Sequence, residues 1–216
     1  MRSSPKLAPS DLCRLPFTGG CKNFHKTALT VTLLIPMSAP VFAQSVGSEV
    51  QRNINQETRI EQGLKSGQLS TSEAARLERG EARIDRMESR ALKDGNLSPE
   101  EATRIHRAQN QESTAISRLK HNEVTGNPNS ASSQRIQGDV QRNINQQNRI
   151  EQGIQSGQLT NKEAARLERG QARVEHAEAR AGADGHVTRR EQASIQHRDN
   201  VQSRHIYKEK HNGRTR

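Results

Sequence analysis

Apolar residues recur at helical spacing in two segments of the chain, 71–93 and 161–183. Within each segment they follow a 3-4-3-4 order, which places them on one face of an α-helix. They are Leu77, Gly80, Ile84, Met87 and Ala91 in the first segment and Leu167, Gly170, Val174, Ala177 and Ala181 in the second. Most of the intervening residues are charged or alanine, so each segment predicts a helix with a narrow apolar seam.

The chain contains an internal duplication. The stretch VQRNINQETRIEQGLKSGQLSTSEAARLERGEAR at 50–83 recurs as VQRNINQQNRIEQGIQSGQLTNKEAARLERGQAR at 140–173, an offset of 90 residues without gaps. Each copy predicts three helices, near 47–65, 71–93 and 99–121 in the first copy and near 137–155, 161–183 and 189–211 in the second. Between the copies, 123–138 is rich in Asn, Ser and Gly, and predicts a flexible linker or the frayed ends of the two helices around it.

Four junctions between predicted helices share one pattern, of which KDGNLSPEE at 93–101 is an example. A glycine suits the left-handed turn that ends a helix, a Ser or Thr three residues later suits an N-cap, and a Glu three residues further completes a capping box. An apolar residue precedes each cap, where a hydrophobic staple is expected. The glycines are Gly67, Gly95, Gly157 and Gly185, the caps are Ser70, Ser98, Thr160 and Thr188, and the apolar residues are Leu69, Leu97, Leu159 and Val187.

The same junctions resemble half of an EF-hand calcium loop. When Asp94 and Gly95 are aligned to loop positions 5 and 6, Glu101 falls on the bidentate position 12. Positions 1 and 3 are then Arg90 and Leu92, which offer no carboxylate. The other three loops also lack carboxylates at ligand positions. Arg180 and Gly182 stand at positions 1 and 3 of the loop around Gly185, and Ser66 and Ser156 stand at position 5 of the loops around Gly67 and Gly157. The pattern therefore favours a helix–turn–helix connection, with weak calcium binding by degenerate loops as the alternative.

The sequence predicts an all-α fold of two tandem repeats, each of about three helices, that is elongated or hairpin-like with a thin core. Large apolar residues are few, whereas the helix formers Ala, Glu, Arg and Gln are abundant. Gly80 and Gly170 within the seams either permit close helix–helix approach or are tolerated weak points. We interpret the many carboxylates of these helices as solvent-facing.

The segment KNFHKTALTVTLLIPMSAPVFAQ at 22–44 is typical of a secretory signal. It has basic residues Lys22 and Lys26, a short apolar run, and small or tolerated residues before a predicted cleavage point after Ala43. The run is short and interrupted by proline, so an uncleaved anchor is the lesser alternative. The remaining chain would be periplasmic or secreted, and would contain neither Cys13 nor Cys21.

Five parts follow from these patterns. They are a signal peptide with an N-terminal extension at 1–43, a first helical repeat at 44–122, a linker at 123–138, a second helical repeat at 139–212 and a basic tail at 213–216. No membrane span is expected after cleavage.

The chain is basic, with 34 Lys and Arg against 24 Asp and Glu and a formal net charge of +10. Only 2% of its residues are aromatic, so it lacks a platform on which bases could stack. Export and the interleaving of acidic and basic residues argue further against nucleic acid as a partner. An anionic envelope surface remains a candidate partner, and a protein partner or self-association is the stronger expectation.

No catalytic motif is present, so we predict a protein that is not an enzyme, and we assign no catalytic, cofactor-binding or metal-binding residue and no cofactor. Histidines gather in the second repeat, where His205 and Glu209 are spaced for one helical face. Imidazole and carboxylate suit copper, zinc or nickel, so a periplasmic metal-binding protein is the alternative function. The second repeat holds His176, His186, His197, His205 and His211, whereas the first holds His106 and His121.

The blocks QRNINQ, RIEQG and EAARLERG, present in both copies, resemble those of a group of exported proteobacterial proteins that carry them in tandem and have no assigned activity. The stretches LSTSE, LSPEE, LTNKE and VTRRE also resemble the helix starts of Spy-type periplasmic chaperones, with Glu where those proteins have Gln. The resemblance implies a non-catalytic exported helical repeat protein that acts by interaction, in a chaperone-like or envelope-stress role.

Overall fold

The structure, a computed structural model, describes residues 41–213, and these residues form helices and turns without a strand. The α-helices are α1 (Val41–Ser66), α2 (Thr71–Ala91), α3 (Pro99–Lys120), α4 (Ala131–Gln155), α5 (Asn161–Ala181) and α6 (Arg189–Lys210), and a short 3₁₀ helix, η1 (Leu92–Asp94), follows α2. The prediction of an all-α fold is confirmed. At an offset of 90 residues, α1, α2 and α3 correspond to α4, α5 and α6.

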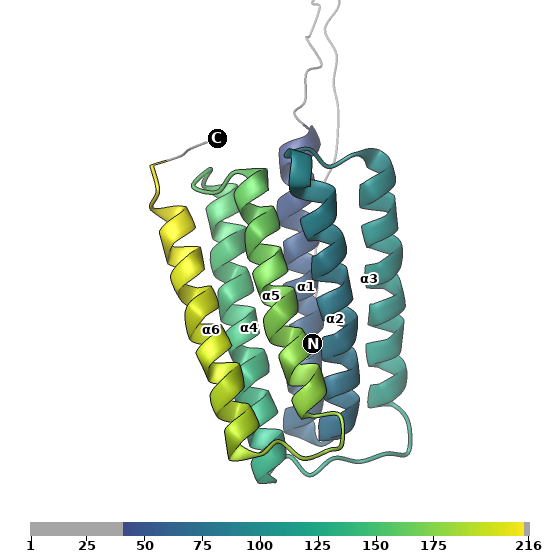
Figure 1. Ribbon diagram of the computed structural model, residues 1–216. Coiled ribbons are helices and arrows are strands. Elements are labelled where there is room, and N and C mark those ends of the chain that lie inside the picture. The colour runs from purple at the N-terminus through teal and green to yellow at the C-terminus, as the bar shows by residue number, and fades with distance from the viewer. Residues whose placement is uncertain (1–40, 214–216) are drawn as a thin grey trace, which may run out of the picture. The chain divides into compact units, whose positions relative to one another are not determined.

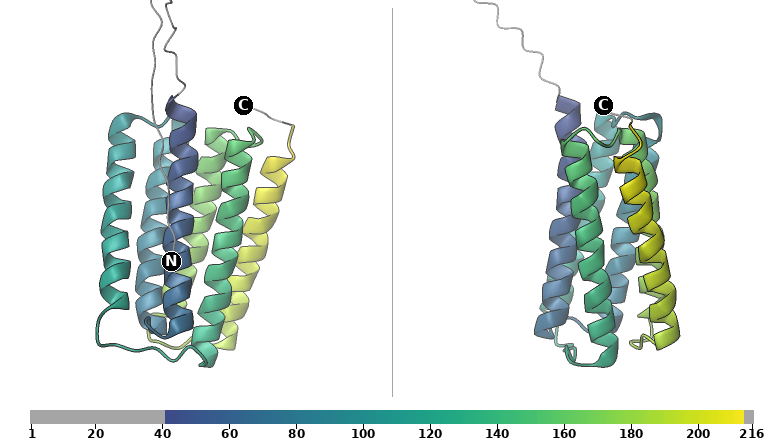
Figure 2. Two further views of the ribbon diagram at one scale, coloured as in Figure 1. Left: turned by 180° about the vertical axis from the view of Figure 1, so that it is seen from behind. Right: turned by 90° about the vertical axis from the view of Figure 1, so that its left-hand side faces the viewer.

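The two sets of three helices pack against each other through α2 with α5 and α1 with α4 (Figure 1). Helix α3 lies against α1 and α2, and α6 lies on the opposite side against α4 and α5 (Figure 2). Helices α2 and α5 run antiparallel, so the start of α5 lies beside the end of α2. There the side-chain amide of Asn161 donates to the carbonyl of Gly95 at 2.8 Å. The thin seam of each repeat is thus covered by the other repeat.

All four predicted junctions are present. The glycines have positive φ angles between 74° and 98°. Each predicted cap accepts a hydrogen bond from the backbone of the Glu three residues on, whose carboxylate accepts from the cap's own N–H, so every box is complete. Leu69, Leu97, Leu159 and Val187 are buried at the staple positions. Pro99 occupies the first turn of α3, where its missing N–H leaves no hydrogen bond unmade.

Two predicted boundaries were wrong. Helix α4 begins at Ala131, inside the predicted linker 123–138, because Ser130 caps it by accepting from the N–H of Ser133 at 3.1 Å. Ile136, which we had placed in the linker, is fully buried on this helix. The connection between the repeats therefore shrinks to residues 121–130. Helix α1 likewise begins at Val41, before its predicted start.

One continuous cluster of buried apolar side chains runs through all six helices. Among the described helices, none combines the length and the apolar character that crossing a membrane requires. The predicted leader lies outside the described residues up to position 40, and the predicted cleavage point after Ala43 falls within the first turn of α1. The predicted basic tail lies outside them beyond residue 213.

Candidate metal centre

Carboxylates line the space that α2 and α5 enclose with α1 and α4. On α2 they form a stripe at i, i+3, i+7 and i+10 that begins at Glu78, one residue after the first position of the apolar seam. On α5 they occupy three of the four equivalent positions. No member is more than 1% exposed. This group, here called the acidic core, consists of Glu57 of α1, Glu78, Glu81, Asp85 and Glu88 of α2, and Glu168, Glu175 and Glu178 of α5.

This burial corrects the sequence-based interpretation that such carboxylates face solvent. The antiparallel packing of α2 on α5 turns both acidic stripes inward. The arginines of the same helices form a separate stripe and stay exposed, at positions 79, 83, 86 and 90 of α2 and 169, 173 and 180 of α5. Within the described chain, no Lys, Arg or His forms a salt bridge with a residue of the acidic core.

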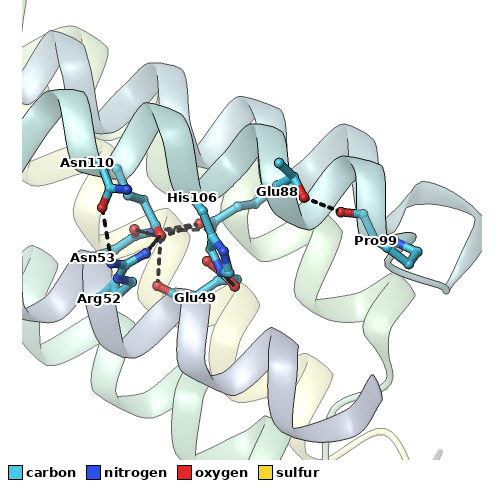
Figure 3. A network of polar contacts seen from close by, with 9 residues as sticks. Glu49, Arg52, Asn53, Glu88, Pro99, His106 and Asn110 are labelled. Atoms are coloured by element: carbon cyan, nitrogen blue, oxygen red, sulfur yellow. Dashed lines mark hydrogen bonds and ion pairs between the residues drawn. The ribbon is translucent and has the colours of Figure 1, made fainter. Parts of the chain in front are cut away.

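Amide side chains from α1, α3 and α4 reach into the core instead of cations. The amide nitrogen of Asn53 donates to Glu88 at 3.0 and 3.1 Å and lies 3.2 Å from Asp85 Oδ1. Gln109 of α3 donates to the Asn53 side-chain oxygen at 2.9 Å and approaches Glu88 at 3.3 Å. Figure 3 shows Asn53 pointing from α1 toward Glu88 on the neighbouring helix. These donors satisfy only part of the core's oxygen atoms.

Three carboxylates converge on one point. Asp85, Glu88 and Glu168 each offer an oxygen, and these three atoms lie within 4.8 Å of one another. The amide nitrogen of Gln147, on α4, lies 3.4 Å from Asp85 Oδ2 and 3.5 Å from Glu168 Oε2. Its amide oxygen is buried, lies on the other side of the amide group and has no hydrogen-bond donor in the described chain. The trio therefore offers three carboxylate oxygens, and a 180° turn of the Gln147 amide would present its oxygen to them as a fourth ligand.

Other polar atoms in the core have no partner either. Neither carboxylate oxygen of Glu57 nor of Glu81 receives a hydrogen bond from any described residue. Both polar atoms of the Gln171 side chain, at the α5 position equivalent to Glu81, are also unpaired and fully buried. Because an unpaired buried polar group costs about 1–3 kcal/mol, such a concentration of them lowers the stability of the fold unless protons, water or a bound ion satisfy these atoms.

Burial raises the pKa of every carboxyl in the acidic core well above its ordinary value, and the neighbouring carboxylates raise it further. Each uncompensated buried charge costs several kcal/mol, whereas the whole free energy of folding of a domain is about 5–15 kcal/mol. The carboxylates cannot all be charged and unpaired in a folded chain. Protons or cations must neutralise them.

A rim of less buried acids surrounds the core. Burial raises the pKa of Glu112 and of Asp139 to about 7 and that of Asp199 to about 6. Burial also raises the pKa of Glu49, although His106 lies 2.5 Å from its carboxylate and opposes the shift (Figure 3). Carboxyls with raised pKa values are therefore also present on α1, α3, α4 and α6.

The histidines of the second repeat do not form a site of this kind. His186, His197, His205 and His211 are exposed, and none joins a group of three potential metal ligands in the described residues. Glu209, which we paired with His205, instead binds Arg166 at 3.2 Å. Figure 1 places α6, which carries His197 and His205, at the edge of the fold.

The EF-hand-like loops use their carboxylates for other purposes. The side chain of Asp94 accepts from the N–H of Asn96 at 2.9 Å, and Asp184 accepts from His186 in the same way. Glu101 and Glu191, at the bidentate position of the motif, complete capping boxes. Their geometry is that of the helix–turn–helix connection.

Sequence reasoning missed the acidic core, yet a signal for it was present. On a solvated helix, acids and bases at i and i+4 attract one another, and like charges at that spacing repel. In α2 the acids instead recur at i+3 and i+4 from one another, and the arginines do so in their own stripe. Such segregation by sign, preserved in both repeats, is the mark of a helix with a buried acidic face.

No protein-family model matches the chain, and neither a curated protein nor a solved structure shows significant similarity to it.

Proposed function

We propose that the chain is a cation-binding protein whose acidic core takes up hard cations that prefer oxygen ligands. The observation that carries this proposal is the convergence of buried oxygens of Asp85, Glu88 and Glu168 within 4.8 Å, with the Gln147 side chain beside them. A cation there would neutralise the buried charge and occupy the free oxygens in one step.

The ligand set selects the class of cation. Carboxylate and amide oxygens suit Ca²⁺, Mg²⁺ and Mn²⁺, whereas copper, zinc and nickel favour the imidazole or thiolate ligands that the trio lacks. Three carboxylates around one position supply more negative charge than a divalent ion carries. Together with the predicted export, this supports a role in sequestering such cations in the periplasm or outside the cell.

Protons are the competitors for the same oxygens. Metal ligands must be deprotonated to bind, so a cation that enters the core must displace the protons that high pKa values retain there. Binding is therefore coupled to proton release and tightens as the pH rises.

The test is calorimetric titration of the full chain, first stripped with a chelator, with Ca²⁺, Mg²⁺, Mn²⁺ and Zn²⁺ in turn. Titration in two buffers of different ionisation enthalpy measures the protons released. We expect saturable binding of at least one of the first three ions with proton release. Absence of binding by all of them overturns the proposal.

A matched pair of variants separates the core from the general acidity of the chain. Glu168→Gln removes one carboxylate of the trio and Glu100→Gln removes an exposed one on α3. We expect the first to weaken binding by about tenfold or more and the second to leave it unchanged. Since Glu168→Gln also removes a buried charge, the variant should fold at least as stably without cations, which distinguishes lost binding from lost structure.

The predicted chaperone-like interaction role has less structural support than cation binding. In the described part of the chain, Val124 and Tyr207 are the large hydrophobic residues that are exposed, so an unfolded client would find little apolar surface. The prediction of a partner or of self-association rests on the sequence alone.

A further inference from the structure

A pocket at the surface gathers arginines from three helices. It has a volume of about 270 Å³ and lies where α5 runs between α2 and α6 (Figure 1). Five of its seven lining residues are arginines, namely Arg86 of α2, Arg169, Arg173 and Arg180 of α5, and Arg198 of α6. All five are exposed, so this arginine pocket opens to solvent.

These arginines are not paired with carboxylates. No Asp or Glu lines the arginine pocket, and in the described chain none of its five arginines forms a salt bridge. Arg86 Nε donates to the carbonyl of Ala82 at 2.9 Å, and Arg169 Nε lies 3.4 Å from Ser89 Oγ. Each of these contacts uses one of the five N–H donors of a guanidinium group. Most donors around the pocket are therefore available to a ligand.

The lack of acids in the pocket follows from the way α2 and α5 pack. Their carboxylates form the stripes that are buried in the acidic core, whereas their arginines occupy the exposed face. The packing that buries the acids therefore leaves the arginines of both helices together on the outside. On a surface where acids and bases alternate, neighbouring side chains would neutralise one another.

His176 lies among the arginines and responds to their charge. Its side chain lines the pocket and is half-buried. Burial lowers the pKa of His176, and the charges of Arg86, Arg180 and Arg79 lower it further. The imidazole is therefore neutral at pH 7, and the positive charge of the pocket is that of its arginines.

The basic surface continues onto α6. A second pocket, of about 320 Å³, lies between α5 and α6 and shares Arg173 and Arg198 with the first. His197 and His205 line this second pocket, and no carboxylate does. In the first repeat, Ala108 corresponds to Arg198 at the offset of 90 residues, so the third helix of that repeat brings no equivalent arginine. The arginine pocket thus belongs to the second repeat.

We propose that the arginine pocket binds ligands that present two or more phosphate groups together. A guanidinium group is planar and donates two parallel hydrogen bonds to a phosphate. Each phosphate brings a charge of about −1.5 to −2 and three acceptor oxygens, so two of them balance most of the charge of five arginines. The pocket is smaller than the roughly 300–1,000 Å³ typical of sites for larger organic ligands, which suits a compact oxyanion.

Two sources supply this chemistry. One is a soluble oligophosphate, and the other is an anionic lipid surface, on which phosphate headgroups lie side by side. Neither depends on cation binding, because the arginines of α2 and α5 lie on the exposed face of these helices and the acidic core on the buried face.

The test uses the full chain, freed of metal ions and then of chelator. It is titrated with inorganic pyrophosphate in a calorimeter and sedimented with vesicles of phosphatidylcholine that contain phosphatidic acid, with pure phosphatidylcholine as the control. Binding of pyrophosphate alone assigns a soluble ligand, and binding to the acidic vesicles alone assigns a lipid surface. If both bind, pyrophosphate should release the chain from the vesicles. Binding of neither overturns the proposal and leaves cation binding in the acidic core standing.

A matched pair of variants locates the site. Arg198→Ala introduces the residue of the first repeat, and Arg204→Ala removes an exposed arginine of the same helix that does not line the pocket. We expect the first to weaken binding by about tenfold or more and the second to change it by less than about twofold. Equal weakening by both variants would show diffuse attraction to a basic chain and would overturn the pocket.

The ring of His176 provides a second readout. A bound phosphate replaces the repulsion from the arginines by attraction, so the pKa of His176 should rise when pyrophosphate is bound. Nuclear magnetic resonance of the histidine rings measures this shift, with the exposed His121 at the end of α3 as the internal control. If pyrophosphate binds and the pKa of His176 stays the same, the anion lies elsewhere and the proposal fails.

Discussion

Gly80 of α2 lies directly beneath the carboxylate of Glu112 on α3: a Cβ placed on Gly80 would come within 1.9 Å of Glu112 Oε2. The equivalent pair in the second repeat is Gly170 and Gln202, with the same clearance to the Gln202 side-chain oxygen. The glycines therefore permit a close approach, although not the close helix–helix approach expected from the sequence. What approaches is a polar side chain and not a helix backbone.

Substitution of these two glycines by alanine should have opposite effects. Alanine favours a helix by about 1 kcal/mol over glycine. Glu112 can swing into solvent and escape the burial that raises its pKa, so Gly80→Ala should leave stability unchanged or increase it by up to about 1 kcal/mol. Gln202 is buried and donates to the carbonyl of Leu167 at 2.9 Å, so its displacement by Gly170→Ala should cost about 1–3 kcal/mol. Urea denaturation of the two variants measures the difference, and equal effects would refute the explanation.

The cation-free chain should lose stability as the pH rises from about 4 to about 7. Glu112, Asp139 and Asp199 have raised pKa values of about 7, 7 and 6 in the folded chain, against about 4 when unfolded. Between these values the folded state holds more protons than the unfolded state, so stability is complete at the lower pH and falls with increasing pH. Denaturation in the presence of a chelator at several pH values measures the slope.

Two controls bracket this pH dependence. Glu112→Gln introduces the residue of the second repeat and should flatten the slope, because one titrating group is removed. Burial alone would raise the pKa of Glu163, but hydrogen bonds from Thr160 and Asn212 and the charge of Arg166 lower it overall. Its contribution is lost only as the pH falls below about 4.5, outside the window. A stability that increases between pH 5 and 7 without cations would contradict the assignment.

The capping boxes of α2 and α5 should each contribute about 1 kcal/mol. Beyond the box itself, Asn122 donates to Glu73 at 2.6 Å and Asn212 donates to Glu163 at 2.7 Å, which fastens the end of the third helix of each repeat to the start of the second. Thr160→Ala and Asn212→Ala should therefore be non-additive in a double-mutant cycle, because both act on Glu163. Strict additivity in thermal denaturation would show that the two contacts are independent.

The helices and most of their ends could be predicted because their determinants are local. Gly67, Ser70 and Glu73 act within seven residues, and the same order recurs at four of the five junctions between the α-helices; the junction before α4 lacks it, and its boundary was predicted wrongly. The acidic core could not be placed in this way. Glu78 and Glu81 are of a residue type that normally faces solvent. Only the packing of α5, 90 residues later in the chain, buries them. The approach of Glu168 and Gln147 to Asp85 and the burial of Glu57 on α1 are tertiary, so no pattern within α2 specifies them.

Exchange of Glu81 and its counterpart Gln171 tests whether the core is under electrostatic strain. Glu81→Gln removes a buried carboxylate that has no hydrogen-bond partner in the described chain, and should stabilise the cation-free protein by about 1–3 kcal/mol at pH 7. Gln171→Glu adds one and should destabilise it by a similar amount. Saturating Mn²⁺ or Ca²⁺ should raise the melting temperature of the unaltered chain and reduce the gap between the two variants, because the cation neutralises the charge that separates them. If both variants melt together without cations, the carboxyls are neutral at pH 7 and protons fill the core. If the gap persists unchanged when cations are bound, the cations bind outside the core.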